Sequence, residues 1–188
     1  MTDRKERRLA KRKERKREQK RFKEYNLLFQ KIRENGSLDD IEDYQLILNE
    51  SKRFIVNRPE WETVILNESK LGFDFKTTKG YFVLGIIFSS TQLKLKGISI
   101  SMPRIAMLSD FCVDDEFYNM IFQLNGEFFG PSITLDHRHN LNIGYCVQKE
   151  MMKNQIGVFL EWIIDTMFMQ KQAFDIKMQQ FRKKLECA

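Results

Sequence analysis

Residues 61–100, WETVILNESKLGFDFKTTKGYFVLGIIFSSTQLKLKGISI, decide the fold of this chain. Apolar and polar side chains alternate here, as at Leu71, Phe73 and Phe75, and a period of two residues is typical of strands with one buried face. Glycines interrupt the alternation, and Lys79-Gly80 is expected to form a turn. We therefore predict an antiparallel meander, with strands around Trp61–Ile65, Leu71–Phe75, Tyr81–Ser89 and Leu93–Ile100.

The sequence after residue 100 predicts two more strands and two more helices. Pro103 is expected to end the meander, and Asp114-Asp115 to open a short helix. Segments Ser132–Asp136 and Leu141–Gln148 flank a polar turn and predict a hairpin. From about Asn154 to Lys184, Phe and Met residues recur at helical spacing. They predict a long final helix that lies across the sheet.

The sequence before residue 61 predicts two helices. Residues 2–34 contain no Gly or Pro, which favours one long helix, but apolar side chains recur at helical spacing only from Phe22 onward. Asn35-Gly36 is expected to end this helix, and Ser37 to cap a second one. The predicted fold class is therefore α+β. We expect an antiparallel sheet of about six strands flanked by helices, with a long basic N-terminal helix and a long C-terminal helix.

Charge is divided unevenly along the chain. The first 23 residues hold thirteen Lys or Arg against four acidic residues, a net charge of +9, whereas the whole chain carries +6. Residues 24–188 therefore sum to −3. This asymmetry predicts a basic N-terminal helical arm, residues 1–36, attached to a single α+β domain, residues 37–188.

The basic arm is the candidate nucleic-acid site. A terminal segment that is one-sidedly basic and rich in both Arg and Lys is typical of phosphate binding. Its cations are not accompanied by an apolar stripe, which disfavours insertion into a membrane surface, and no heptads follow it as in a bZIP protein. We expect contacts to the backbone of RNA or DNA, with little sequence specificity. The candidate residues are Arg4, Lys5, Arg7, Arg8, Lys11, Arg12, Lys13, Arg15, Lys16, Arg17, Lys20 and Arg21.

Two short motifs, Gly126-Glu127-Phe128-Phe129 and Leu141-Asn142-Ile143, precede a long helix rich in Phe and Met. In these motifs and in the order of its elements, the segment from about residue 60 to 184 resembles the YbjN-like and type III secretion chaperone-like group of proteins. The resemblance implies a small, often dimeric, protein-binding module without a diagnostic catalytic motif. The basic arm and the second helix lie outside it.

Cysteine usage predicts a cytoplasmic protein. Cys112, Cys146 and Cys187 are odd in number and form no CxxC pair, as expected for reduced thiols. The basic N-terminal region is not followed by an apolar stretch, so we do not expect a signal peptide. The apolar run Ile156–Met169 is short for a bilayer span and contains two acidic residues, so we expect a core helix there and no membrane partner.

Residues that could bind a metal are few. His137 and His139 could ligate one together with Asp136 or Cys146, but histidines at a hairpin tip are more often simply exposed. The chain also has no GxGxxG, P-loop, GxSxG or HExxH motif. We therefore expect no bound metal, no cofactor and no catalytic residue.

Two other groups of reactive side chains have structural interpretations. Cys112 and Cys146 have apolar neighbours in the sequence and are expected to be small core residues, because the local sequence offers no basic or histidine neighbour. Asp110, Asp114 and Asp115 could form a cation cluster, but capping of a helix N-terminus explains them better.

These observations predict a non-enzymatic binding protein. It would engage nucleic acid or a nucleoprotein particle through its basic N-terminal helix, and a protein partner through its α+β domain. The alternative is a secretion-chaperone-like adaptor, of phage or mobile-element origin, that binds and modulates an acidic protein partner. A third class is a small enzyme that uses the histidine turn. A homodimer is expected, because an edge strand or a broadly apolar last helix needs a cover.

Overall fold

The structure is a computed structural model, and it describes residues 38–69, 71–89, 94–153 and 155–182. The predicted basic arm, its helix and the cap at Ser37 lie outside these residues. The chain divides into two compact units, Met1–Glu42 with Phe88–Leu95, and Asp43–Ile87 with Lys96–Ala188. The second unit contains nearly all of the described elements.

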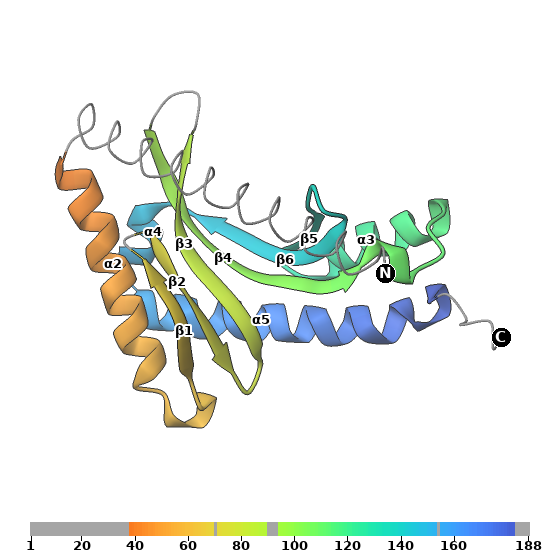
Figure 1. Ribbon diagram of the computed structural model, residues 1–188, viewed down its shortest axis with the longest axis horizontal. Helices are drawn as coiled ribbons and strands as arrows, with labels where there is room; N and C mark the ends of the chain where they lie inside the picture. The colour runs from red at the N-terminus through yellow and green to blue at the C-terminus, as the bar shows by residue number, and fades with distance from the viewer. Residues whose placement is uncertain (1–37, 70, 90–93, 154, 183–188) are drawn as a thin grey trace, which may run out of the picture. The chain divides into compact units, whose positions relative to one another are not determined.

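Six strands form one antiparallel sheet, as the sequence predicts. They are β1 (Val64–Ser69), β2 (Gly72–Thr77), β3 (Gly80–Ser89), β4 (Lys94–Met107), β5 (Ser132–Leu135) and β6 (Asn140–Val147). The order across the sheet is β1-β2-β3-β4-β6-β5 (Figure 1). The first four strands are therefore a meander, and the β5–β6 hairpin joins it through β6. This leaves β1 and β5 as the two edges.

The first strand begins at Val64 and not at Trp61 as predicted. Residues Pro59–Trp61 form a short 3-10 helix, η1, because the fixed φ of proline suits the first position of a helix. Trp61 is buried, and its carbonyl accepts a hydrogen bond from the Thr78 N–H at 2.9 Å. This bond ties η1 to the turn between β2 and β3.

The fourth strand continues through Pro103 to Met107, so the prediction that Pro103 ends the meander is wrong. The pairing with β6 shifts register between Met102 and Ala106, and this bulge contains the proline. Arg104 has a φ of 54°, and its N–H donates to Asn142 Oδ1 at 2.8 Å. A side-chain oxygen thus takes the place of the carbonyl partner that the bulge displaces.

The described helices are α2 (Leu38–Val56), α3 (Asp115–Glu127), α4 (Lys149–Lys153) and α5 (Ile156–Lys177), with 3-10 helices η2 (Leu108–Asp110) and η3 (Met178–Phe181). The last helix is therefore shorter than the predicted Asn154–Lys184. Its N-terminus is set at Gln155, whose φ of −148° is not helical. Its end tightens into η3, where the Phe181 carbonyl accepts the Cys112 N–H at 2.7 Å. Among the helices of the described segments, none combines the length and the apolar character that a bilayer span requires.

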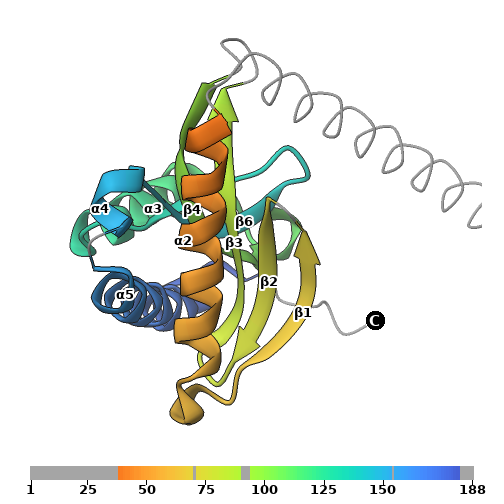
Figure 2. The ribbon, with the colours of Figure 1, turned by 90° about the vertical axis from the view of Figure 1, so that its left-hand side faces the viewer.

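One face of the sheet is buried beneath helices, and α2 and α5 both lie on that side (Figure 2). Alternate residues of the strands supply the core, and the rings of Phe75 and Phe82 stack with centroids 5.4 Å apart. Truncating one such buried ring to Ala typically costs about 3–5 kcal/mol. The buried strand residues include Phe73, Phe75, Phe82, Leu84, Ile98, Ile100, Met102 and Ile143, and those of α5 include Leu160, Ile163, Ile164, Met167 and Phe174.

The edge strand β5 is closed by a side chain of α3. Asn125 Oδ1 accepts the N–H of Ile133 at 2.6 Å, and Asn125 Nδ2 donates to the carbonyl of Ile133 at 3.1 Å. The amide thus bonds both main-chain groups of Ile133, as a neighbouring strand would. Gln170 of α5 donates to the same Oδ1 at 3.4 Å and links the three elements.

We predict that Asn125→Ala lowers the free energy of unfolding by about 2 kcal/mol, because it leaves a donor and an acceptor of Ile133 without protein partners. Urea denaturation at neutral pH would measure the loss. Asn119→Ala, on the exposed side of the same helix, is the matched control and should change stability by less than about 0.5 kcal/mol. Equal losses in the two variants would contradict this role for Asn125.

Candidate interaction site

The twelve residues predicted to bind nucleic acid, from Arg4 to Arg21, lie outside the residues that the structure describes. The geometry available is that of the α+β domain, in which three regions contain surface side chains of chemical interest. These are the charged side of α5, the solvent-facing side of α3, and a hollow beside the β5–β6 turn.

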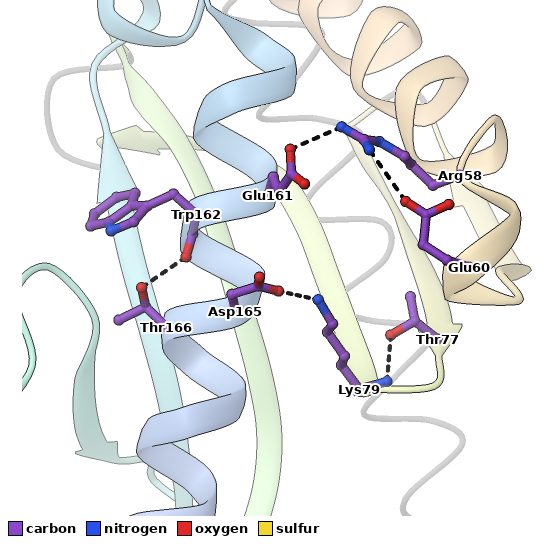
Figure 3. Close-up of polar contacts among 8 residues, drawn as sticks. All are labelled: Arg58, Glu60, Thr77, Lys79, Glu161, Trp162, Asp165 and Thr166. Atoms are coloured by element: carbon purple, nitrogen blue, oxygen red, sulfur yellow. Dashed lines mark hydrogen bonds and ion pairs between the residues drawn. The ribbon is translucent and has the colours of Figure 1, made fainter.

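The charged side of α5 is neutralised by residues from earlier in the chain (Figure 3). Glu161 pairs with Arg58 at 2.9 Å, and Asp165 pairs with Lys79 of the β2–β3 turn. The Lys79 ammonium also lies 5.3 Å from the ring centroid of Trp61. These contacts fix α5 against η1 and the turn, and they leave little net charge on this side of the helix.

The solvent-facing side of α3 carries large aromatic side chains. Tyr118, Phe122 and Phe129 are 52%, 79% and 87% exposed, and we call these three residues the α3 aromatic surface. The sequence analysis assigned only the opposite side of this helix, through Phe117 and Leu124, and both of those residues are indeed fully buried. The aromatic surface was missed, although its members also recur at helical spacing.

Trp162 of α5 borders the α3 aromatic surface. Its ring lies 6.4 Å from that of Phe129 and 5.9 Å from those of Tyr145 and Phe159. Gly130, with a φ of 106°, allows this packing, because a Cβ there would lie 2.8 Å from the indole. The position of the Trp162 ring is thus set by packing on several sides.

Acidic residues surround the α3 aromatic surface. Asp114 caps α3, since its Oδ1 accepts the Phe117 N–H at 2.8 Å, and this confirms the predicted capping role. Asp115 and Glu116 follow in the first turn and are exposed. Residues 105–137 hold six Asp or Glu and no Lys or Arg. This part of the surface is therefore acidic as well as aromatic.

The third region is a hollow of about 530 Å³ that contains an exposed thiol. It is lined by residues from the end of β4, from η2 and its continuation, and from the β5–β6 turn. Cys112 lies in it together with Arg138 and His139, and the His139 carbonyl accepts the Leu108 N–H at 2.9 Å. The fold thus supplies the basic and histidine neighbours that the local sequence lacks.

The expectation that Cys112 and Cys146 are core residues is wrong, because both are exposed. Cys112 follows the buried Phe111 but lies outside regular structure, so its side chain is not bound to the buried face. Cys146 faces away from the core because it alternates with the inward Val147 along β6. Partial burial against its neighbours nevertheless raises the pKa of the Cys146 thiol.

The histidine turn is organised by Asp136. Its Oδ1 accepts the N–H groups of Arg138 and Asn140 at 2.7 and 3.0 Å, and its Oδ2 accepts the Asn140 side-chain amide at 3.0 Å. Hydrogen bonds from Asn140, first from its side chain and then from its backbone, hold the pKa of Asp136 well below its usual range. His137 and His139 are exposed. Within the described ranges, no three His, Cys, Asp or Glu side chains gather as a metal site.

Comparison with known proteins gave no match to a family model, to a curated protein or to a solved structure. The resemblance to secretion-chaperone-like proteins therefore stays a prediction.

We predict that the Cys112 thiol reacts faster than the Cys146 thiol with the anionic disulfide DTNB at pH 8. The Arg138 cation lines the hollow of Cys112 and attracts the reagent, whereas the raised pKa of Cys146 leaves less thiolate. The comparison uses Cys187→Ser proteins that also lack one of the other two cysteines. Arg138→Gln should slow only the Cys112 reaction, by a few fold. If neither thiol reacts until denaturant is added, both are core residues after all.

Asp136 also predicts a pH dependence of stability. Its pKa is lowered in the folded state, so its contribution is fully present above the unfolded value of about 4 and is lost as pH falls through the folded value. Asp136→Asn should therefore be less stable than wild type at pH 7, and the gap should narrow by more than about half at pH 2.5. Urea midpoints at the two pH values measure this, and an equal gap at both would contradict it. Asn140→Ala should show the same narrowing, since it removes the other partner.

Proposed function

We propose that this chain is a non-enzymatic binding protein that engages nucleic acid, or a nucleoprotein particle, through its basic N-terminal segment and a protein partner through its α+β domain. The observation that supports the first half is the net charge of +9 within residues 1–23, against −3 for all of the remainder. Each Lys or Arg that contacts a phosphate releases condensed counterions, so a segment of this charge favours a polyanion.

The ion pairs of the domain support the same division of roles. Seven Lys or Arg side chains pair with carboxylates, so much of the domain's positive charge is matched locally. They are Lys52, Arg58, Lys79, Lys149, Lys153, Lys171 and Lys177. In contrast, the arm has thirteen cations for four acids and is the better candidate for phosphate contacts.

The surface of the domain supports a protein partner. Contiguous exposed aromatic surface is uncommon on monomeric soluble proteins and often marks an interaction site. The homodimer remains part of the proposal, because α5 also exposes Val158, Met169 and Ile176 on its side away from the core. The cytoplasmic location remains part of it too, on the basis of cysteine usage.

The test is binding of the full chain to a mixed-sequence duplex and to a structured RNA over a range of salt concentrations. Five to eight phosphate contacts give a slope of log affinity against log salt of roughly −4 to −7. Replacing Arg12, Lys13, Arg15, Lys16 and Arg17 by Gln should make the slope shallower by about 4 and weaken all sequences about equally.

A matched control removes the same charge from the domain, by replacing Arg53, Lys76, Arg104, Arg138 and Arg182 with Gln. It should leave the slope nearly unchanged. Equal loss in both variants would mean that net charge alone governs binding. If the intact chain binds no nucleic acid even at low salt, the proposal falls and an adaptor that binds an acidic protein takes its place.

A further inference from the structure

The α3 aromatic surface is too apolar to be explained as ordinary surface. Phe122 and Phe129 are 79% and 87% exposed, while Phe117 on the other side of the same helix is fully buried. The helix therefore anchors itself to α5 and β5 with one side and presents aromatic rings on the other. Burying such rings provides much of the free energy of most protein interfaces, in which aromatic residues are enriched.

A notch in the helix lies between the two exposed rings. Gly126 follows Phe122 by one helical turn and precedes Phe129 by three positions, and it is exposed. A Cβ built at Gly126 would have no heavy atom within 4 Å, so neither core packing nor its backbone conformation requires glycine there. Glycine in a helix interior is unfavourable, whereas at a helix contact it lets another backbone approach closely.

The charge around the surface indicates what would cover it. Asp115 lies on the same exposed side as Tyr118, one turn earlier, and Glu116 is adjacent. Residues 105–137 contain no Lys or Arg to balance their six acids. A second copy of α3 would therefore bring like charges together, whereas a cationic partner would be attracted.

We propose that the α3 aromatic surface is a docking site for a cationic amphipathic helix of a partner protein. An apolar side chain of that helix would pack over Gly126, between Phe122 and Phe129, and its Lys or Arg side chains would face Asp115 and Glu116. This mode reads a partner through apolar anchors at helical spacing, with charge setting its orientation. The inference rests on the protein-binding half of the proposed function and specifies the chemistry of that partner.

The experiment measures binding of a fluorescent synthetic peptide to the full-length protein by anisotropy. The probe is a Leu/Lys amphipathic helix of about five turns. Two control peptides are the same sequence with Glu in place of Lys, and a shuffled sequence without an apolar face. We expect measurable binding of the Leu/Lys helix alone, and weakening of that binding at higher salt.

Three protein variants locate the contact. Gly126→Leu should weaken binding by about tenfold or more while raising the melting temperature, because it fills the notch with a better helix former that meets no neighbour. Phe122→Ser with Phe129→Ser should abolish binding. Ile176→Ser, which removes an equally exposed residue (71%) from α5, is the matched control and should leave the affinity unchanged.

Equal affinity of the Leu/Lys and Leu/Glu peptides, or an unchanged affinity in Gly126→Leu, would overturn the proposal. Sedimentation of the same variants tests the other occupant. If Gly126→Leu converts a dimer to a monomer, the surface binds a second copy and the proposal is wrong. Nucleic-acid binding is measured separately and should be unaffected by all three variants, so loss of peptide binding and failure of the arm are distinguishable.

Discussion

A cluster of four phenylalanines holds α3 in place, and the character of the exposed surface depends on it. Phe111 lies 5.4 Å from Phe117 and 5.9 Å from Phe174 between ring centroids, and Phe117 lies 5.6 Å from Phe181. The cluster joins the segment after β4, the first turn of α3, the last turns of α5 and η3. Because it occupies the side of α3 that bears Phe117, the side that bears Tyr118 and Phe122 is left to solvent.

The parts of the fold that depend on neighbours in sequence were predictable. The alternation around Phe73 and Phe75 gave the meander, and Asp114 caps α3 through a bond to a residue three positions away. Pro103 was misjudged because the side chain that stabilises its bulge, Asn142, belongs to a different strand. Local pattern shows that a proline disfavours a strand, but it does not show what compensates for it.

The candidate sites were harder to predict for the same reason. The thiol of Cys112 shares its hollow with Arg138 and His139, which lie on a hairpin that the sequence places far from it. On α3, both Leu124 and Phe122 fit a helical stripe, and only the position of α5 decides which of the two is buried. Periodicity identifies the faces of a helix, whereas the choice between them is made by tertiary packing.

The two functions proposed for the chain place their charges in different ways. In the domain, Glu161 and Asp165 meet Arg58 and Lys79 as individual pairs, each of which stabilises a surface contact by at most about 1 kcal/mol. Their value lies in fixing where α5 sits relative to η1 and the β2–β3 turn. The arm, by contrast, has few acids to pair with its cations, so its charge remains available to an external polyanion.

The amide of Asn125 has a consequence for how the domain meets other molecules. It occupies the main-chain groups of Ile133 on β5, while the opposite edge, β1, is interrupted by a bulge between Ile65 and Asn67 and carries a charged residue, Glu68. Neither rim of the sheet thus offers a long, regular template for an added strand. The domain is protected against strand-by-strand polymerisation, and recognition is left to side chains on its helices.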